Sequence, residues 1–276
     1  MKVIINLLKF ILITVLTICM ISIGIITIIF STVLSKNYII QKLEETDFYS
    51  GTYKLVESNF ENYIYQSGLD KEVLQNICTQ EKVEADINVM LSNIYDGTDQ
   101  KIETNEISEN LNTNIDKMSI KTKQNEQAIN EFVEHICKEY TDTLIHSQYE
   151  LKINNEYIKV IEILNKIYNI VFIVLVVDFI AILIANRKKF YKDIQYIGIA
   201  MLATSIFQLI SCQVVQAKVN IKGIKIFNDV FSNSIVTIIQ DVLYKINSMA
   251  IGILAFAVLC NAIYVAIIVN KKQKKI

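Results

Sequence analysis

The chain has 276 residues, of which 52% are hydrophobic, with no proline, no tryptophan and seven glycines. Its mean hydropathy of +0.36 comes from a few apolar blocks, which argues against one large soluble core and predicts a membrane protein. The net charge of −1 conceals a partition: residues 36–160 hold 12 lysines against 23 acidic residues, so nucleic acid is not an expected partner of that segment.

Four apolar blocks are long enough to cross the hydrocarbon core of a bilayer, which takes roughly 20 helical residues. They are residues 10–34, 167–185, 194–215 and 248–269. We expect the first (domain 1–36) to remain as a span rather than be cleaved as a signal peptide, because its apolar run is long and it lacks an A-x-A-like site. The lipid bilayer is therefore an expected partner, and the absence of proline favours regular helices.

Basic residues at the ends of these blocks predict the orientation of the chain. Arg187, Lys188, Lys189 and Lys192 fill the short loop after span two, and other lysines precede span one and end the chain. Span two and this loop together make up segment 161–193. The positive-inside rule then predicts a multi-pass cell-membrane protein with both termini and the loop in the cytoplasm and residues 37–160 outside. The segment 218–247 also carries four lysines, but its aspartates lower the excess.

Residues 37–160 are expected to be helical, because apolar residues recur at helical spacing and Gly97 stands where a C-terminal cap belongs. No helix breaker separates this domain from span two, and none separates it from span one, so we expect both spans to continue into it as helices. The predicted fold class is all-α: a four-helix transmembrane bundle with an acidic extracytoplasmic helical domain inserted between spans 1 and 2. The apolar stripes are Tyr53, Val56, Phe60, Tyr63 and Ile64; Val83, Ile87, Met90, Leu91 and Ile94; Ile107, Leu111, Ile115 and Met118; and Ile129, Phe132, Val133, Ile136, Tyr140 and Leu144.

Span three (194–217) is followed by an amphipathic segment, 218–247, and then by span four with a basic tail, 248–276. One face of 227–246 is continuously apolar, but Asp229, Asp241 and Lys245 make the segment too polar to cross a membrane. We expect an extracytoplasmic helix that either packs under the helical domain or lies in the membrane interface. The preceding VNIKGIKI (219–226) fits a short strand or an extended segment.

Motifs for catalysis are absent: the chain has no G-x-S-x-G, no P-loop, no G-x-G-x-x-G and no H-E-x-x-H. The two histidines, His135 and His146, would lie about 16 Å apart on one helix, too far to hold one metal ion. We therefore expect no enzyme activity, no cofactor and no metal site.

Two of the five cysteines, Cys78 and Cys137, fall outside the spans. A disulfide between them would contribute about 4 kcal/mol in the chain-entropy model. The sequence leaves open whether they form this bond or are two independent buried thiols.

Asp178 interrupts the apolar run of span two. Its insertion costs roughly 2.5–3.5 kcal/mol, whereas the fourteen Ile, Leu, Val and Phe residues of 167–185 contribute roughly −4 to −8 kcal/mol. The span can therefore insert, and the carboxyl should face the bundle interior. Counting residues inward from the span ends predicts an intramembrane polar layer of Thr17, Asp178, Thr204 or Ser205, and Asn261.

This polar layer has three interpretations. It is interhelical hydrogen bonding between a protonated Asp178 and Asn261, a proton- or cation-binding station, or a recognition site for a partner's transmembrane helix. The order of spans resembles, in topology, the permease-like components of ABC-transporter complexes, which have four spans with a large loop after the first. The chain departs from that layout because only about nine residues precede span one, too few for an N-terminal coupling helix.

The functional expectation follows from a substantial outer domain without a catalytic constellation. We expect a non-enzymatic integral membrane protein that acts through its extracytoplasmic domain as a sensor, scaffold or accessory subunit, with a protein partner and with a homo-oligomer as another option. The alternative is a small proton- or cation-coupled transporter or channel built around Asp178.

Overall fold

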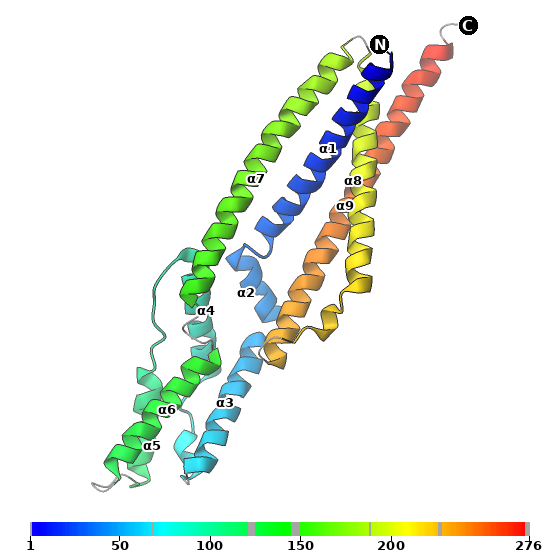
Figure 1. The fold of residues 1–276 in the computed structure, drawn as a ribbon. Helices are drawn as coiled ribbons and strands as arrows, with labels where there is room; N and C mark the ends of the chain where they lie inside the picture. The colour runs from blue at the N-terminus through cyan, green and yellow to red at the C-terminus, as the bar shows by residue number, and fades with distance from the viewer. Residues whose placement is uncertain are drawn as a thin grey trace. The chain divides into compact units, whose positions relative to one another are not determined.

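The computed structural model describes residues 2–67, 69–120, 125–144, 150–187, 189–225 and 228–273. All regular elements in these ranges are helices, and 86% of the described residues are helical, so the all-helical class is confirmed. In chain order (Figure 1) they are α1 (Lys2–Ser31), α2 (Lys36–Glu45), α3 (Phe48–Ser67), η1 (Lys71–Leu74), α4 (Gln80–Asp96), α5 (Asn105–Lys117), α6 (Glu126–Leu144), α7 (Glu150–Ala185), α8 (Tyr191–Lys218), η2 (Ile221–Gly223) and α9 (Asp229–Gln273). In the described part of 219–226 the chain forms the 3₁₀ turn η2 with extended residues on either side rather than a strand.

The chain divides into two compact units. The span unit comprises Met1–Val33, Ile161–Ile224 and Val236–Ile276, and the insert unit comprises Leu34–Val160 and Lys225–Ile235. Helices α7 and α9 each have residues in both units. The expected continuation of span two into the preceding helix is therefore confirmed by α7.

The expected continuation of span one is wrong, because α1 ends at Ser31 and α2 begins at Lys36. Ser35 caps the new helix: its backbone is extended, and its hydroxyl accepts a hydrogen bond from the Tyr38 amide at 3.4 Å. Such a cap satisfies an amide that would otherwise lack a partner at a helix start. The Thr32 hydroxyl donates back to the Ile28 carbonyl at the end of α1.

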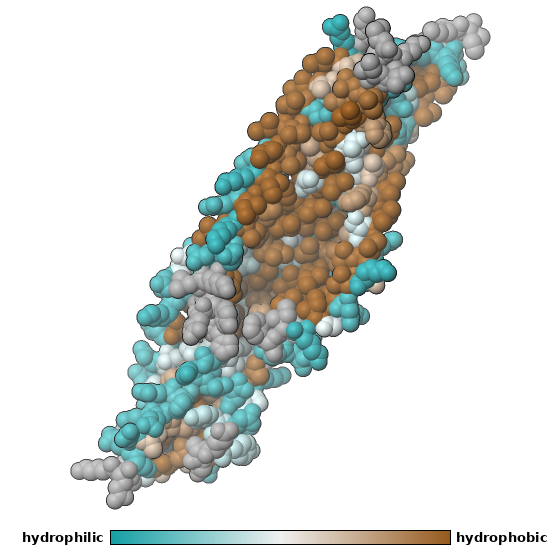
Figure 2. Space-filling model, viewed as in Figure 1, coloured by the Kyte–Doolittle hydropathy of each residue, from teal (hydrophilic) through white to brown (hydrophobic). Residues whose placement is uncertain are grey.

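In the part of the chain that the structure describes, four helices are long and apolar enough to cross a membrane: Asn6–Ser31, Ile153–Ala185, Tyr191–Lys218 and Asp229–Gln273. They indicate a multi-pass membrane protein. Only 11% of the most apolar window of α7 and 6% of that of α9 is buried, so the apolar side chains of these helices largely face outward, as contact with lipid requires. Figure 2 shows this apolar surface running along the spans.

Helix α8 buries its polar side and exposes its apolar side. Thr204, Ser205 and Gln208 are at most 1% exposed, whereas Ile206 and Phe207 are at least 50% exposed. A helix on the surface of a soluble protein shows the reverse pattern. Polar residues turned into the bundle and apolar residues turned outward are what a lipid environment favours.

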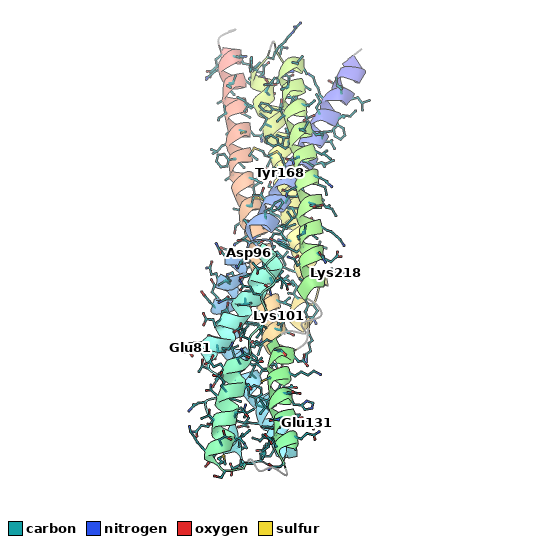
Figure 3. The ribbon with its side chains drawn as sticks, turned by 90° about the vertical axis from the view of Figure 1, so that its left-hand side faces the viewer. Glu81, Asp96, Lys101, Glu131, Tyr168 and Lys218 are labelled. Atoms are coloured by element: carbon teal, nitrogen blue, oxygen red, sulfur yellow. The ribbon has the colours of Figure 1, made fainter. Side chains whose placement is uncertain are left out.

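The insert unit is held by a core that the apolar stripes predicted. Helix α4 begins at the Thr79 cap, whose hydroxyl accepts from the Lys82 amide, and ends at Gly97, whose φ of +68° favours glycine. Glu81 on α4 and Glu131 on α6 are exposed (Figure 3). Ten side chains of the predicted stripes are at most 2% exposed: Val56, Phe60, Ile64, Val83, Met90, Ile107, Leu111, Ile115, Ile136 and Tyr140.

The first turns of α9 pack within the insert unit. The Phe231 ring meets the Phe48 ring edge-to-face at 5.5 Å between centroids, and the hydroxyls of Ser234 and Thr46 are 2.8 Å apart. Of the two placements expected for the amphipathic segment, packing against the helical domain therefore holds for 229–235. Residues 236–247 belong to the span unit and continue into span four, because no glycine or proline interrupts α9 before Gly252.

Candidate functional site

Asp178 faces the interior of the span unit. It is 5% exposed, and it lies one turn from Ile182, which forms a buried cluster with Leu16 of α1 and Ala200 of α8. It is also near enough to Cys19 to interact with it electrostatically. Its Oδ2 atom has no hydrogen-bond partner among the described residues. A carboxyl in this position has unused capacity to bind a proton, a cation or a donor.

The structure brings Thr17 and Thr204 together at the same level. The Thr204 hydroxyl donates to the Thr17 carbonyl at 3.4 Å, one turn from the Leu16–Ala200 contact. Ser205 is fully buried but donates to the Leu202 carbonyl of its own helix at 2.9 Å. Thr204 and Asp178 therefore lie one turn from a common apolar cluster, whereas Ser205 satisfies itself locally.

Asn261 lies elsewhere along the bundle. Its amide packs against Gly198, where an added Cβ would come within 2.8 Å of Nδ2. Gly198 precedes Thr204 by six residues, or about 9 Å of helix. The Asn261 Nδ2 donates to the Ala257 carbonyl at 2.8 Å. The structure therefore places Asn261 apart from Thr17 and Thr204, and it pairs the amide with its own helix rather than with Asp178.

Gln208 and the Asn186–Asp193 pair are also buried in the span unit. Both amide atoms of Gln208, 1% exposed, lack a partner among the described residues. Asp193 accepts from the Asn186 amide at 2.8 Å through Oδ1, and its Oδ2 is likewise unpartnered. Gln208 continues the polar side of α8 that the sequence indicated. The Asn186–Asp193 pair was missed, because both residues flank a basic loop that reads as solvated.

The insert unit contains a buried polar cluster around Asp86. The Lys82 ammonium donates to both Asp86 oxygens, at 3.0 and 2.8 Å, and the Tyr140 hydroxyl donates to Oδ2 at 2.5 Å. Lys82 also donates to the Glu103 carbonyl at 2.9 Å. The sequence analysis missed this cluster, although the i,i+4 spacing of Lys82 and Asp86 beside the apolar stripe of α4 was a usable signal.

Cys78 borders this cluster. Its thiol lies against the Tyr140 hydroxyl, and burial raises its pKa to about 11, with the Lys82 charge partly opposing the shift. Burial, and secondly the hydrogen bond to Asp86, raises the pKa of Tyr140. Both groups are therefore neutral at physiological pH. The cluster holds one ion pair and two neutral donors, which is a structural network rather than an activated nucleophile.

Cys78 and Cys137 are both free thiols in the structure. The Cys137 thiol lies 3.9 Å from the Thr104 carbonyl, whereas Cys78 lies against Tyr140. His135 packs against the Tyr63 ring at 5.5 Å, and His146 lies outside the described residues. Across the described ranges no three His, Cys, Asp or Glu side chains are grouped to hold a metal ion.

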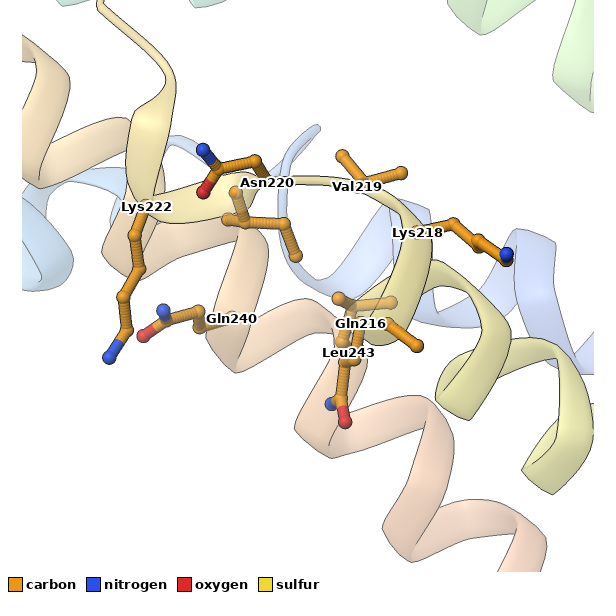
Figure 4. A pocket seen from close by; sticks show the side chains of 9 residues that line it. Gln216, Lys218, Val219, Asn220, Lys222, Gln240 and Leu243 are labelled. Carbon is orange, nitrogen blue, oxygen red and sulfur yellow. The ribbon is translucent and has the colours of Figure 1, made fainter.

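An open groove of about 600 Å³ lies in the span unit beside η2. Its polar lining comprises Gln216, Lys218, Asn220, Lys222 and Gln240, and Leu243 of α9 adds an apolar wall (Figure 4). Neutral donors outnumber charges here, so the groove has no strong preference for one class of ligand.

Comparison with known proteins identifies no relative: no family model, no curated protein and no solved structure matches the chain.

Proposed function

We propose that the chain is a non-enzymatic integral membrane protein that acts through its insert unit, held outside the cell, as a sensor, scaffold or accessory subunit of a membrane complex. Helix α9 carries this proposal. Its first turns pack on Phe48 in the insert unit, and its later residues form an apolar span. A partner that changes the packing around Phe48 would therefore act on the helix that continues into span four.

The test is purification of the full chain from native membranes in mild detergent, followed by lysine cross-linking and mass spectrometry. We expect a second protein in stoichiometric amount, cross-linked to exposed lysines of the insert unit such as Lys101. A partner cross-linked only through Lys271 and Lys272 of the tail would contradict action through the insert unit. A homo-oligomer without any other protein would contradict the accessory-subunit interpretation.

Orientation has its own test. Charge supports cytoplasmic termini and an extracytoplasmic insert unit. A chain whose only cysteine replaces the exposed Lys101 should react with a membrane-impermeant maleimide in intact cells, and a chain whose only cysteine replaces Lys271 should not. The opposite pattern would reverse the orientation.

The second candidate is a proton- or cation-coupled transporter, and the buried polar face of α8 supports it. Thr204 and Gln208 lie one turn apart on that face, and Asp178 of α7 is buried with a free carboxyl oxygen. Polar and ionisable groups inside a membrane bundle often mark a proton or ion path. Asp178→Asn should then abolish proton or cation flux into proteoliposomes while leaving partner binding intact. Equal flux for both chains would reject a transport role for Asp178.

A further inference from the structure

A basic pocket lies in the span unit where α1 begins, α7 ends and α8 begins. Its volume is about 240 Å³. Among the described residues, four cationic side chains and a buried amide line it, with two apolar residues at the end of α7: Lys9, Arg187, Lys189, Lys192, Asn186, Ile184 and Ala185. None of these residues enters the proposals for the insert unit or for Asp178.

Hydrogen bonds join described residues on either side of the turn between α7 and α8, which carries three of the cations. The Lys189 amide donates to the Asn186 carbonyl at 2.5 Å, and the Lys192 amide donates to the Lys189 carbonyl at 2.8 Å. The Asn186 side chain donates to Asp193 at 2.8 Å, and both residues are only 4% exposed. Lys189 and Lys192 therefore extend from hydrogen-bonded backbone.

Lys9 brings the fourth cation from a distant part of the sequence. Its ammonium lies 5.7 Å from the centroid of the Tyr196 ring on α8, within the range of a cation–π contact. Among the described residues, none of the four cations forms an ion pair with a carboxylate, and the buried Asp193 is hydrogen-bonded to Asn186. Like charges gathered around one pocket repel each other unless an anion binds among them.

We propose that this pocket binds a phosphate-bearing anion, and that the anion is the headgroup of an acidic phospholipid. Lysine and arginine are the side chains that bind phosphate oxygens most strongly. Basic pockets between transmembrane helices bind acidic lipid headgroups. The 65% exposed Ile184 places apolar surface beside the cations, as the acyl chain of a lipid requires and a free phosphate does not.

The orientation of the spans in the membrane could by itself explain how many cations lie here, but it does not explain why they line one pocket. The positive-inside rule needs basic residues near a span end and imposes no pocket. The lysines at the end of α9 and beyond it serve that role equally and supply a matched control.

The experiment measures binding of a fluorescent short-chain phosphatidylglycerol to the purified full chain in neutral detergent. The test variant combines Lys9→Gln, Lys189→Gln and Lys192→Gln. Each lysine near an anionic headgroup contributes about fivefold to affinity, so we expect affinity to fall at least about tenfold. Replacing the same three lysines by arginine keeps the charges and should retain binding. This variant shows whether a loss of affinity comes from loss of charge or from misfolding.

The control variant removes three charges near the end of the chain by Lys272→Gln, Lys274→Gln and Lys275→Gln, and its affinity should stay within about twofold of the parent. A neutral phosphatidylcholine probe should bind the parent and the test variant alike. Inorganic phosphate at millimolar concentration should displace little of the lipid probe. If it binds with the same lysine dependence as the lipid, the site takes free phosphate and the lipid assignment is overturned. An equal loss of affinity in the tail control, or no loss in the test variant, overturns the site itself.

Discussion

The ion pair of Lys82 with Asp86 provides the sharpest test of how the insert unit is held together. The perturbation is Lys82→Met, which keeps the length and apolar character of the side chain and removes its charge. The Lys82 and Asp86 side chains are 16% and 8% exposed. After the substitution the Asp86 carboxylate retains the Tyr140 hydroxyl but has no cation beside it.

The expected cost follows from this burial. Removing one partner of a buried ion pair destabilises by about 3–5 kcal/mol, because an uncompensated charge remains out of water. Exposed pairs contribute less than about 1 kcal/mol. Lys159 and Glu156, 63% and 60% exposed and 2.8 Å apart, provide the matched control through Lys159→Met. Adding Asp86→Asn to Lys82→Met should recover part of the loss, since the amide carries no charge.

The assay is amide hydrogen exchange of the full chain in detergent, followed by mass spectrometry of peptides from α4 and α6. An opening free energy lower by 3 kcal/mol corresponds to exchange faster by about a hundredfold. Lys82→Met should reach this factor in both helices, and Lys159→Met should leave them unchanged. If Lys82→Met accelerates exchange less than threefold, the ion pair does not stabilise the insert unit and the reasoning fails.

Three further results are expected. Gly51→Ala should accelerate amide hydrogen exchange in 229–235, at the start of α9, because the new Cβ would come within 2.8 Å of Val230. Adding Val230→Ala should restore the slower exchange, because it removes the methyl groups that the new Cβ meets. In a chain with Cys78 as its only cysteine, the rate of alkylation should rise with pH up to about pH 11, because burial raises the pKa of the Cys78 thiol from 9.0 to about 11. The stability that the neutral thiol contributes is therefore present below pH 9 and is lost as pH rises toward 11. Half-maximal reactivity near pH 9 would contradict the burial of Cys78. Gln208→Leu should maintain or raise the melting temperature in detergent, because both buried amide atoms lack partners in the described structure. Gln213→Leu, at an exposed position, should leave it unchanged. A lower melting temperature for Gln208→Leu alone would mean that the assembled protein supplies a partner to the amide.

Local sequence signals predicted most of the insert unit and the spans. Val83, Met90 and Ile107 fall on helical stripes and are at most 1% exposed, and Gly97 ends α4 in the left-handed conformation. The break between α1 and α2 was not predicted. It depends on the cap that Ser35 forms, and Ser35 is followed by an ordinary helical sequence that offers no other stop signal.

The candidate sites were harder to predict, because they depend on the offsets between helices. Depth counting from span ends assumes that all four helices start at equal levels. The contact of Asn261 with Gly198 fixes a different offset between α9 and α8, and α9 continues to Gln273, beyond the end assumed for span four. The pairing of Tyr140 with Asp86 joins positions 54 residues apart, which no local pattern encodes.

Gln208 distinguishes between the interpretations of the span unit more sharply than Asp178 does. A proton neutralises the Asp178 carboxyl, but the Gln208 amide cannot titrate and needs a donor and an acceptor together. A partner's transmembrane helix cannot reach a side chain that is 1% exposed unless the bundle opens. The described residues supply neither a donor nor an acceptor, so the amide is a buried polar group whose replacement by leucine should not destabilise the bundle. At Gly24 of α1, an added Cβ would lie 2.7 Å from Met249 of α9 and 3.4 Å from Gln208. Because Met249 and Gln208 both lie against Gly24, a shift of α9 within the span unit would change the surroundings of Gln208.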